Sequence, residues 1–234
     1  MDYILQGLKD AVKMMIGADR ELLLITFVSV RVSSVSTLLA SLAGVPAGFV
    51  IAFGNFPGRK TLVTVFRTLL ALPTVVVGLF LYSILSRSGP LGNLRLLYTQ
   101  TAMVMGQFLL AFPIVTALTI SALSSVDRRV GPTAVSLGAT RFQPAFAILR
   151  EGRFAIIAAI VAAFGRVFGE VGVSMMLGGN IRSYTRNLTT GIAFQTGRGE
   201  FSLGLALGVI LLTVALCINL LVRFLEVDSS KSTI

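Results

Sequence analysis

Five apolar runs, each about twenty residues long, constrain the fold of this chain more than any other feature. They cover residues 32–53, 61–86, 99–123, 154–178 and 201–225. A helix of about 20 apolar residues is long enough to cross the hydrocarbon core of a bilayer. Only 13% of the residues are charged, and the mean hydropathy is +0.88, so the chain has too few polar side chains to cover a soluble surface. The sequence therefore predicts an all-α, polytopic membrane protein with about five transmembrane helices.

The segment before the first run is expected to behave differently. The stretch 22–30 is apolar but too short to cross a membrane alone, and Arg31 ends it. We therefore interpret residues 1–30 as an amphipathic lead-in helix on the membrane surface. Residues 31–226 are expected to form a single transmembrane domain. Residues 227–234 form a short polar tail, for which a disordered end is the default expectation.

The first three runs contain residues that usually interrupt or weaken a helix. Pro46, Pro73 and Pro113 lie within them, where neighbouring helices can satisfy the carbonyl groups that each proline frees. The first run is also rich in serine, threonine and glycine, which permit close approach of a second helix in lipid. We therefore expect all three runs to remain spans within a packed bundle.

Composition excludes several classes of function. The net charge is +10, but the basic residues are scattered singly and in pairs, which argues against nucleic-acid binding. There is no histidine, and the one cysteine, Cys217, lies in an apolar run, so Cys/His zinc sites, disulfides and imidazole-dependent triads are excluded. No Gly-x4-Gly-Lys-Ser/Thr motif is present, so the chain cannot hydrolyse ATP by a P-loop mechanism. We expect no catalytic residue, no metal site and no cofactor bound by this chain.

A polar, half-apolar stretch at residues 124–153 separates the third and fourth runs. Within it, Phe142, Phe146 and Leu149 follow one another at the spacing of one helix face, and Gly138 interrupts the pattern. This predicts two short helices at an angle. The alternative from periodicity alone is an amphipathic loop that lies on the lipid surface.

The residues of this stretch resemble the cytoplasmic EAA loop of ABC importer permeases. Residues 133–140 read TAVSLGAT, and two phenylalanines follow. Pro132 occupies the Glu position of the pattern, and Arg150-Glu151 replaces its Leu-Pro. Without the Glu, a salt bridge from this position to the ATPase is not expected, but docking of the helix in a cleft of the ATPase still is. The resemblance implies that the following residues couple the chain to an ATPase: Ala134, Ser136, Leu137, Gly138, Ala139, Thr140, Phe142 and Phe146.

A second resemblance starts in the fourth run. Residues 164–172 read FGRVFGEVG, and 175–181 read MMLGGNI. A basic residue, Gly-Glu-x-Gly and a Gly-Asn-Ile turn are typical of the molybdate, sulfate and tungstate permeases. Thr185, the Thr-Thr pair at 189–190 and TGRGEF at 196–201 are most similar to the tungstate-type branch. The resemblance implies a translocation path or gate formed by Arg166, Glu170, Gly178, Gly179, Asn180 and Thr185.

Two interpretations of the charged residues stay open. Arg166 and Glu170 are four residues apart on one helix face, deep in an apolar run. They either give an anion path its charge or form an ion pair that only joins helices. The 22-residue loop after this run carries Arg182, Arg186 and Arg198, and it either forms a gate or docking site or is an ordinary solvated loop.

The family resemblance implies a type I ABC importer permease-like bundle in a prokaryotic inner membrane. Its partners would be a second copy of itself, membrane lipid, separate ABC ATPase subunits that hold ATP and Mg²⁺, and an extracytoplasmic substrate-binding protein. The cargo would be a tetrahedral oxyanion, with tungstate favoured over molybdate, sulfate or another anion. Basic residues are almost equally divided between the two sides, so they do not decide orientation. A cytoplasmic EAA-type loop implies an external N-terminus and an internal C-terminus.

Two other classes of membrane protein are possible alternatives. An ion-coupled secondary transporter usually carries inverted repeats and broken helices around a central site, and no repeat is visible across the five runs. A membrane scaffold or intramembrane hydrolase would need a nucleophile and a base. Without histidine only a Ser–Lys or carboxylate pair remains, and Lys13 and Lys60, the lysines nearest the runs, lie outside them. Neither class is favoured.

Overall fold

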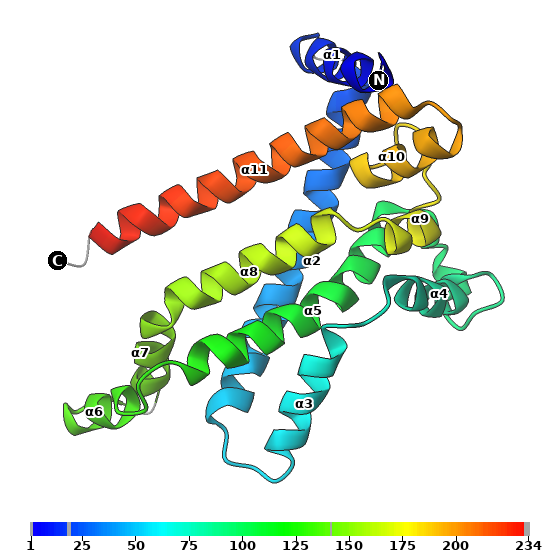
Figure 1. Cartoon of the computed structure of the whole chain (residues 1–234). Coiled ribbons are helices and arrows are strands. Elements are labelled where there is room, and N and C mark those ends of the chain that lie inside the picture. The colour runs from blue at the N-terminus through cyan, green and yellow to red at the C-terminus, as the bar shows by residue number, and fades with distance from the viewer. Residues whose placement is uncertain (1, 18–19, 141, 232–234) are drawn as a thin grey trace.

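The computed structural model describes residues 2–17, 20–140 and 142–231, and the described part is helical and has no strands (Figure 1). The helices are α1 (Asp2–Ile16), α2 (Arg20–Phe53), α3 (Arg59–Leu69), α4 (Thr74–Leu85), η1 (Gly92–Leu94), α5 (Gln100–Ser124), α6 (Val130–Ser136), α7 (Gln143–Glu151), α8 (Arg153–Phe168), α9 (Gly172–Gly178), α10 (Leu188–Gly197) and α11 (Phe201–Lys231). Among the described residues, α2, α5 and α11 are each long and apolar enough to cross a membrane. The number of spans rises to 5 if each of two bent helix pairs counts as one. The predicted all-α membrane bundle is confirmed.

The lead-in is shorter than predicted. α1 ends at Ile16, and α2 continues without a break through Arg31, where we expected a boundary. No glycine or proline occurs in α2 before Gly44, and the Arg31 side chain is exposed, so nothing interrupts the backbone there. α1 packs on α11, because a Cβ added to Gly7 would lie 2.8 Å from Leu205 Cδ2. Arg31 does not mark a boundary, since a cation on an exposed face does not end a helix.

The second and fourth runs are not straight helices. α3 and α4 form a pair bent by 98°, and α8 and α9 form a pair bent by 59°. Pro73 lies at the first bend as the residue that caps α4, and it has no N–H with which to continue the preceding helix. Gly169 ends α8 at the second bend. Each predicted span therefore contains a turn that its hydropathy does not reveal.

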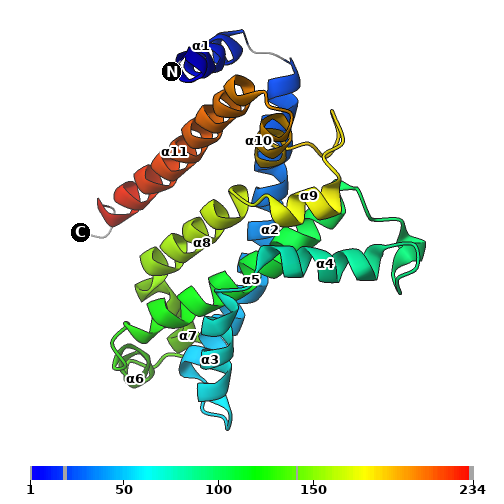
Figure 2. The ribbon, with the colours of Figure 1, turned by 45° about the vertical axis from the view of Figure 1, so that its right-hand side comes forward.

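α2 and α5 run parallel and pack closely. Ser36 on α2 faces Gln107 on α5, and further along α2 a Cβ added to Gly48 would lie only 2.7 Å from Thr119 Cβ. Both helices therefore start at the same end of the bundle, as the two views in Figures 1 and 2 show. The small residues of the first run serve this contact, as predicted, and Pro46 and Pro113 remain inside the two helices.

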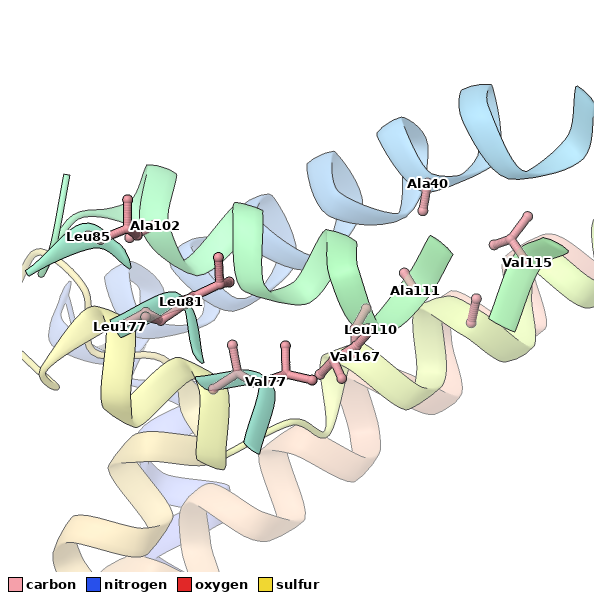
Figure 3. Packing of buried hydrophobic residues seen from close by; sticks show 12 residues of the cluster. Ala40, Val77, Leu81, Leu85, Ala102, Leu110, Ala111, Val115, Val167 and Leu177 are labelled. Carbon is pink, nitrogen blue, oxygen red and sulfur yellow. The ribbon is translucent and has the colours of Figure 1, made fainter. Parts of the chain in front are cut away.

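The largest apolar core joins α2, α4, α5, α8 and α9 (Figure 3). Val77 and Leu81 of α4 meet Leu110 of α5, Val167 of α8 and Leu177 of α9 in this cluster. A buried polar ladder crosses the same region. The Ser36 hydroxyl lies 3.5 Å from Gln107 Oε1, and Gln107 Nε2 donates to the Ser174 hydroxyl at 3.3 Å. The ladder and the core hold the short helix α9 against the two long helices.

The segments that flank α11 also differ from expectation. The 22-residue loop contains the helix α10, whose Thr189, Thr190 and Gly191 are buried. α11 continues to Lys231, beyond the boundary expected at residue 226, and residues 232–234 of the predicted tail lie outside the described part. α6 and α7 occupy one end of the molecule, while α9 and α10 lie toward the opposite end (Figure 1). The predicted site residues are therefore divided between two ends.

Candidate functional site

The α6–α7 loop (residues 130–151) forms two short helices joined at Gly138, as predicted. Gly138 has a φ of +88°, a conformation that favours glycine, and the Ala139 N–H donates to the Ala134 carbonyl at 3.0 Å to close the turn. The Ser136 hydroxyl donates to the Thr133 carbonyl, and the Thr140 N–H donates to Gln143 Oε1 at 2.7 Å. These predicted coupling residues thus shape the turn between the two helices.

The three large apolar side chains around this turn are exposed. Leu137 is 82% exposed, Phe142 is 79% exposed and Phe146 is 70% exposed. On the opposite side of the loop, Ile148 is buried with Leu123 and Ile156 in a separate apolar cluster, so the loop is attached to the bundle. The loop therefore presents an apolar surface that the chain itself does not cover.

Arg166 and Glu170 form an ion pair across the bend between α8 and α9. Arg166 Nη1 lies 3.0 Å from Glu170 Oε2, and the exposed fractions of the two side chains are 48% and 4%. Glu170 Oε1 accepts a hydrogen bond from the Val173 N–H at 3.3 Å, so the carboxylate also caps the first turn of α9. The Thr189 hydroxyl donates to the Glu170 carbonyl at 2.9 Å. The Glu170 carboxylate is therefore buried and bound to both Arg166 and the start of α9, while about half of the Arg166 side chain is exposed in the single chain.

The turn that follows α9 (residues 178–187) is closed by its own hydrogen bonds. Gly179 and Asn180 have φ values of 67° and 51°. The Thr185 hydroxyl donates to the Gly178 carbonyl at 2.5 Å and accepts from the Ile181 N–H at 3.0 Å. Gly178 packs against Met103, whose Sδ would lie 2.7 Å from an added Cβ. Thr185 and Gly178 are buried, so they set the shape of this turn from inside.

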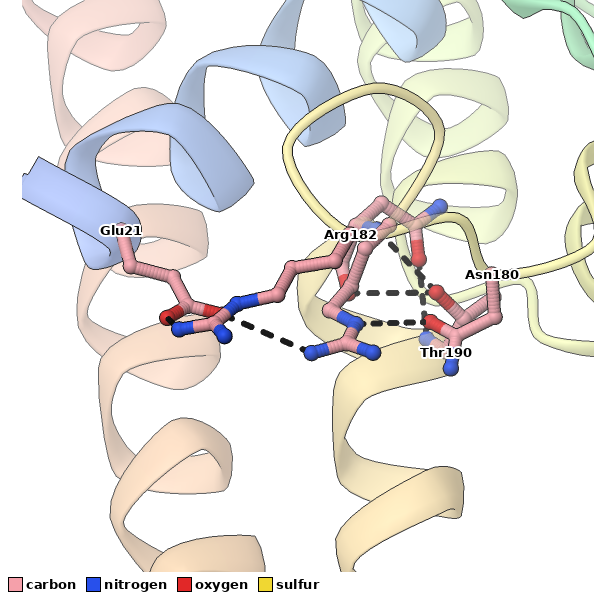
Figure 4. A network of polar contacts seen from close by, with 6 residues as sticks. Glu21, Asn180, Arg182 and Thr190 are labelled. Atoms are coloured by element: carbon pink, nitrogen blue, oxygen red, sulfur yellow. Dashed lines mark hydrogen bonds and ion pairs between the residues drawn. The ribbon is translucent and has the colours of Figure 1, made fainter.

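Glu21 joins the start of α2 to the same turn, a link that the sequence analysis missed (Figure 4). Arg182 binds the Glu21 carboxylate with two nitrogens, at 3.0 and 2.5 Å, and Arg186 Nη1 lies 3.4 Å from it. Arg186 Nε also donates to Asn180 Oδ1 at 3.3 Å. The sequence left open whether these arginines belong to a gate or docking site or to an ordinary solvated loop, and in the structure both are engaged within the chain.

Asn187 ends the turn and begins α10. Its side chain accepts from the Thr190 N–H at 2.8 Å, and the Thr190 hydroxyl accepts from the Asn187 N–H at 3.1 Å, which is a reciprocal cap. The Leu188 N–H donates to the Ser29 hydroxyl of α2 at 2.8 Å. Asn is a preferred residue at the N-cap of a helix, and Thr190 stands at the third helical position.

The predicted residues therefore form two separate regions. The exposed coupling residues lie at one end, and Gly178, Gly179, Asn180 and Thr185 lie beyond the far end of α8. A 16-residue helix such as α8 is about 24 Å long. No group of three or more His, Cys, Asp or Glu side chains that could hold a metal ion occurs in the described part of the chain.

Comparison with known proteins agrees with both resemblances. The family model described as "Binding-protein-dependent transport system inner membrane component" matches residues 44–229. The tungstate uptake system permease proteins TupB of Peptoclostridium acidaminophilum and Campylobacter jejuni are 36% and 37% identical. Both alignments cover 97% of this chain, with 99% and 95% of the respective relatives. A probable anion ABC transporter permease protein of Haloferax volcanii is 39% identical over 84% of this chain and 87% of its own.

These matches confirm the predicted resemblance to the permeases of the oxyanion group. They cover the α6–α7 loop, the Arg166–Glu170 pair and the 178–187 turn within one continuous family match. The chain belongs to the inner membrane components of binding-protein-dependent transport systems, a family of multi-pass membrane permeases.

Proposed function

We propose that the chain is the membrane-spanning permease subunit of an ABC importer that carries a tetrahedral oxyanion, tungstate in the first place, into the cytoplasm. The proposal of tungstate as the substrate rests on the similarity to two tungstate uptake permeases along 97% of the chain. The chain itself performs no covalent chemistry and binds no cofactor. ATP and Mg²⁺ belong to a separate ATPase, and an extracytoplasmic binding protein delivers the anion.

The α6–α7 loop is the proposed contact with the ATPase. Its exposed Leu137, Phe142 and Phe146 offer the apolar anchors that a helix uses when it docks in a cleft of another protein. Because α7 continues almost directly into α8, movement of this loop would be transmitted along α8 to the bend at Glu170. Transport is then a switch between an inward-open and an outward-facing state, driven by the ATPase.

The path is proposed to run between two copies of the chain, embedded in lipid. Arg166 would give this path positive charge through its exposed half, while Glu170 holds the guanidinium in place. Gly179 and Asn180 would form a gate at the far end, and the buried Gly178 and Thr185 would act through the shape of that turn. The α6–α7 loop faces the cytoplasm in this proposal, so the N-terminus is outside and the C-terminus inside.

Competition for uptake tests the substrate. Cells with and without this chain are given tungstate, molybdate and sulfate together, and their W, Mo and S contents are measured by elemental analysis. Loss of tungsten accumulation alone is the expected result. Loss of a different element keeps the importer and corrects its substrate, whereas no change in any of the three contradicts the proposed function.

A further inference from the structure

A basic cavity lies in the segment between α4 and α5, outside every site described so far. Its volume is ≈ 930 Å³, and its lining includes Arg87, Asn93, Arg95 and Tyr98. Because Tyr98 lies two residues before Gln100, the first residue of α5, this cavity lies at the end of the bundle where α2 and α5 begin, away from the α6–α7 loop. It is therefore on the side where the proposed importer would receive its cargo.

Among the residues whose side chains the structure describes, no carboxylate neutralises the charge of this cavity. No aspartate or glutamate occurs between Glu21 and Asp127, and none lines the cavity. Within the described residues, every ion pair of the structure involves other arginines, not Arg87 or Arg95. Two guanidinium groups without a carboxylate partner among the described side chains favour an anionic ligand. This arrangement contrasts with Arg182 and Arg186, which share Glu21.

Two tyrosines connect this cavity to a second one. Tyr82 and Tyr98 line both, and their hydroxyl oxygens are 3.3 Å apart. The second cavity, of ≈ 650 Å³, is also lined by Met176, Gly179 and Ile181, so it reaches the 178–187 turn. The hydrogen bond with Tyr82 is the largest cause, and burial the second, of a pKa of Tyr98 that lies above its ordinary value of 10.0. An anion bound at Arg87 and Arg95 would therefore lie in the cavity next to the one that Gly179 of the proposed gate lines.

The backbone around this cavity is held in uncommon conformations. Arg95 and Tyr98 have φ values of 50° and 64°, in the left-handed region that non-glycine residues seldom adopt. The Tyr98 N–H donates to the Leu177 carbonyl of α9 at 2.8 Å, and a Cβ added to Gly179 would lie 2.7 Å from the Tyr98 ring. Strained residues persist where the surrounding structure fixes them, often at ligand sites. Here Tyr98 is held by Leu177 at the end of α9 and by Gly179 in the 178–187 turn, which is the proposed gate.

We propose that Arg87 and Arg95, with Asn93 and the Tyr98 hydroxyl, form a receiving site for a tetrahedral oxyanion that has left the binding protein, ahead of the gate at Gly179. This inference rests on the proposed function and adds a second anion site to the proposed path at Arg166. A cavity lined by two guanidinium groups and a side-chain amide suits a small dianion better than the flat contact of a docked protein.

The test uses the complete permease–ATPase complex in phosphatidylcholine nanodiscs. Tungstate binding without the binding protein is measured by equilibrium dialysis and elemental analysis for wild type, Arg87→Gln, Arg95→Gln and the control Lys9→Gln, an exposed residue of α1 at the same end. Each arginine variant is expected to bind tungstate about tenfold more weakly, because a charge-assisted hydrogen bond is lost. The control is expected to bind like wild type, and circular dichroism establishes that each variant is folded.

Two further measurements separate other ligands. The binding-protein concentration that half-maximally stimulates ATP hydrolysis is expected to stay unchanged in the arginine variants, and a rise with unchanged tungstate binding would assign the arginines to protein docking and overturn the proposal. Nanodiscs with phosphatidylglycerol are expected to bind tungstate as before. If that lipid competes in wild type but not in the arginine variants, the site holds a lipid phosphate and the proposal fails. Binding of tungstate by a wild-type complex that imports no oxyanion would refute the proposed function but keep the site.

Discussion

The α6–α7 loop and the 178–187 turn lie toward opposite ends of the bundle and differ in how they are stabilised. In the loop, the large side chains of Leu137, Phe142 and Phe146 are at least 70% exposed. In the turn, Thr185 is fully buried and closes the backbone by two hydrogen bonds, and a carboxylate from α2 holds its arginines. The turn is stabilised within the single chain, whereas the loop has an apolar surface that the described part of the chain does not cover.

This difference in burial predicts which substitutions should affect folding and which should affect assembly. Removing an exposed apolar side chain costs a folded chain almost nothing, but it removes an anchor from an interface. Removing a buried hydrogen-bonding group destabilises the chain whether or not a partner is present. The predictions below use this distinction and run from the largest expected effect to the smallest.

The largest effect is expected at the apolar surface of the α6–α7 loop. In the variant Phe142→Ala/Phe146→Ala, anion uptake should fall to background, because loss of an anchor residue costs about 2 kcal/mol or more of binding free energy. The melting temperature of the permease should stay within about 2 °C of wild type. Phe27→Ala, which removes a phenylalanine exposed on α2, is the matched control and should retain uptake. Equal losses of uptake in both variants would contradict the distinction between the two regions.

The Arg166–Glu170 pair is expected to affect both stability and transport. Arg166→Gln leaves a carboxylate that is 4% exposed without its cation, which should cost about 1–2 kcal/mol of unfolding free energy, less than for a fully buried pair because Arg166 is 48% exposed. The double variant Arg166→Gln/Glu170→Gln should recover most of this loss in a denaturation experiment.

Uptake distinguishes the two roles of this pair. If the Arg166 charge lines the path, the double variant stays defective in transport although its stability has returned. Normal uptake kinetics in Arg166→Ala would show that Arg166 does not line the path. Its role in the wild type would then be the structural ion pair with Glu170 alone.

An effect on stability of about the same size, but without loss of a charge from the proposed path, is expected inside the 178–187 turn. Thr185→Ala leaves the Gly178 carbonyl and the Ile181 N–H without their partner, which should lower the unfolding free energy by about 1–2 kcal/mol. Thr185→Ser keeps the hydroxyl and should recover at least half of the loss in the same measurement. Indistinguishable melting temperatures for the two variants would show that the hydroxyl does not hold this turn.

The smallest effect belongs to the exposed ion pair of the same turn. The Arg182 side chain is 71% exposed, so Arg182→Gln should cost less than about 1 kcal/mol. Salt screens exposed charges, so the difference in melting temperature between variant and wild type should shrink as the salt concentration rises from about 0.01 M to about 1 M. A loss that is large and independent of salt would place this contact among the buried interactions of the turn.

Hydropathy predicted the number of apolar runs, but not the direction of the helix axis within them. The runs around Pro73 and Gly169 have the composition of straight spans, yet both are bent. At the second bend Glu170 accepts a hydrogen bond from the Val173 N–H, a local contact that a hydropathy profile does not register. Gly138 was more informative, because a glycine between two apolar helix faces predicted the turn that the structure contains.

The candidate site was predictable only where neighbours in sequence make the contact. Arg166 and Glu170 are four residues apart, so their pairing followed from helix geometry. Glu21 lies 161 residues before Arg182, and the Tyr82–Tyr98 contact depends on a loop with two left-handed residues. Such contacts are created by the tertiary fold, and the sequence pattern around each residue contains no trace of its partner.

The most direct test of this account is the accessibility of Phe146 with and without the ATPase. A cysteine is introduced as Phe146→Cys in a Cys217→Ala background, because the native Cys217 is itself exposed, and its rate of labelling by a maleimide is measured in the purified permease. The account predicts rapid labelling of the permease alone and strong protection once the ATPase is bound. A cysteine placed as Phe27→Cys should be labelled at the same rate in both states. Unchanged labelling at position 146 in a verified permease–ATPase complex would contradict the assignment of the α6–α7 loop as the coupling surface.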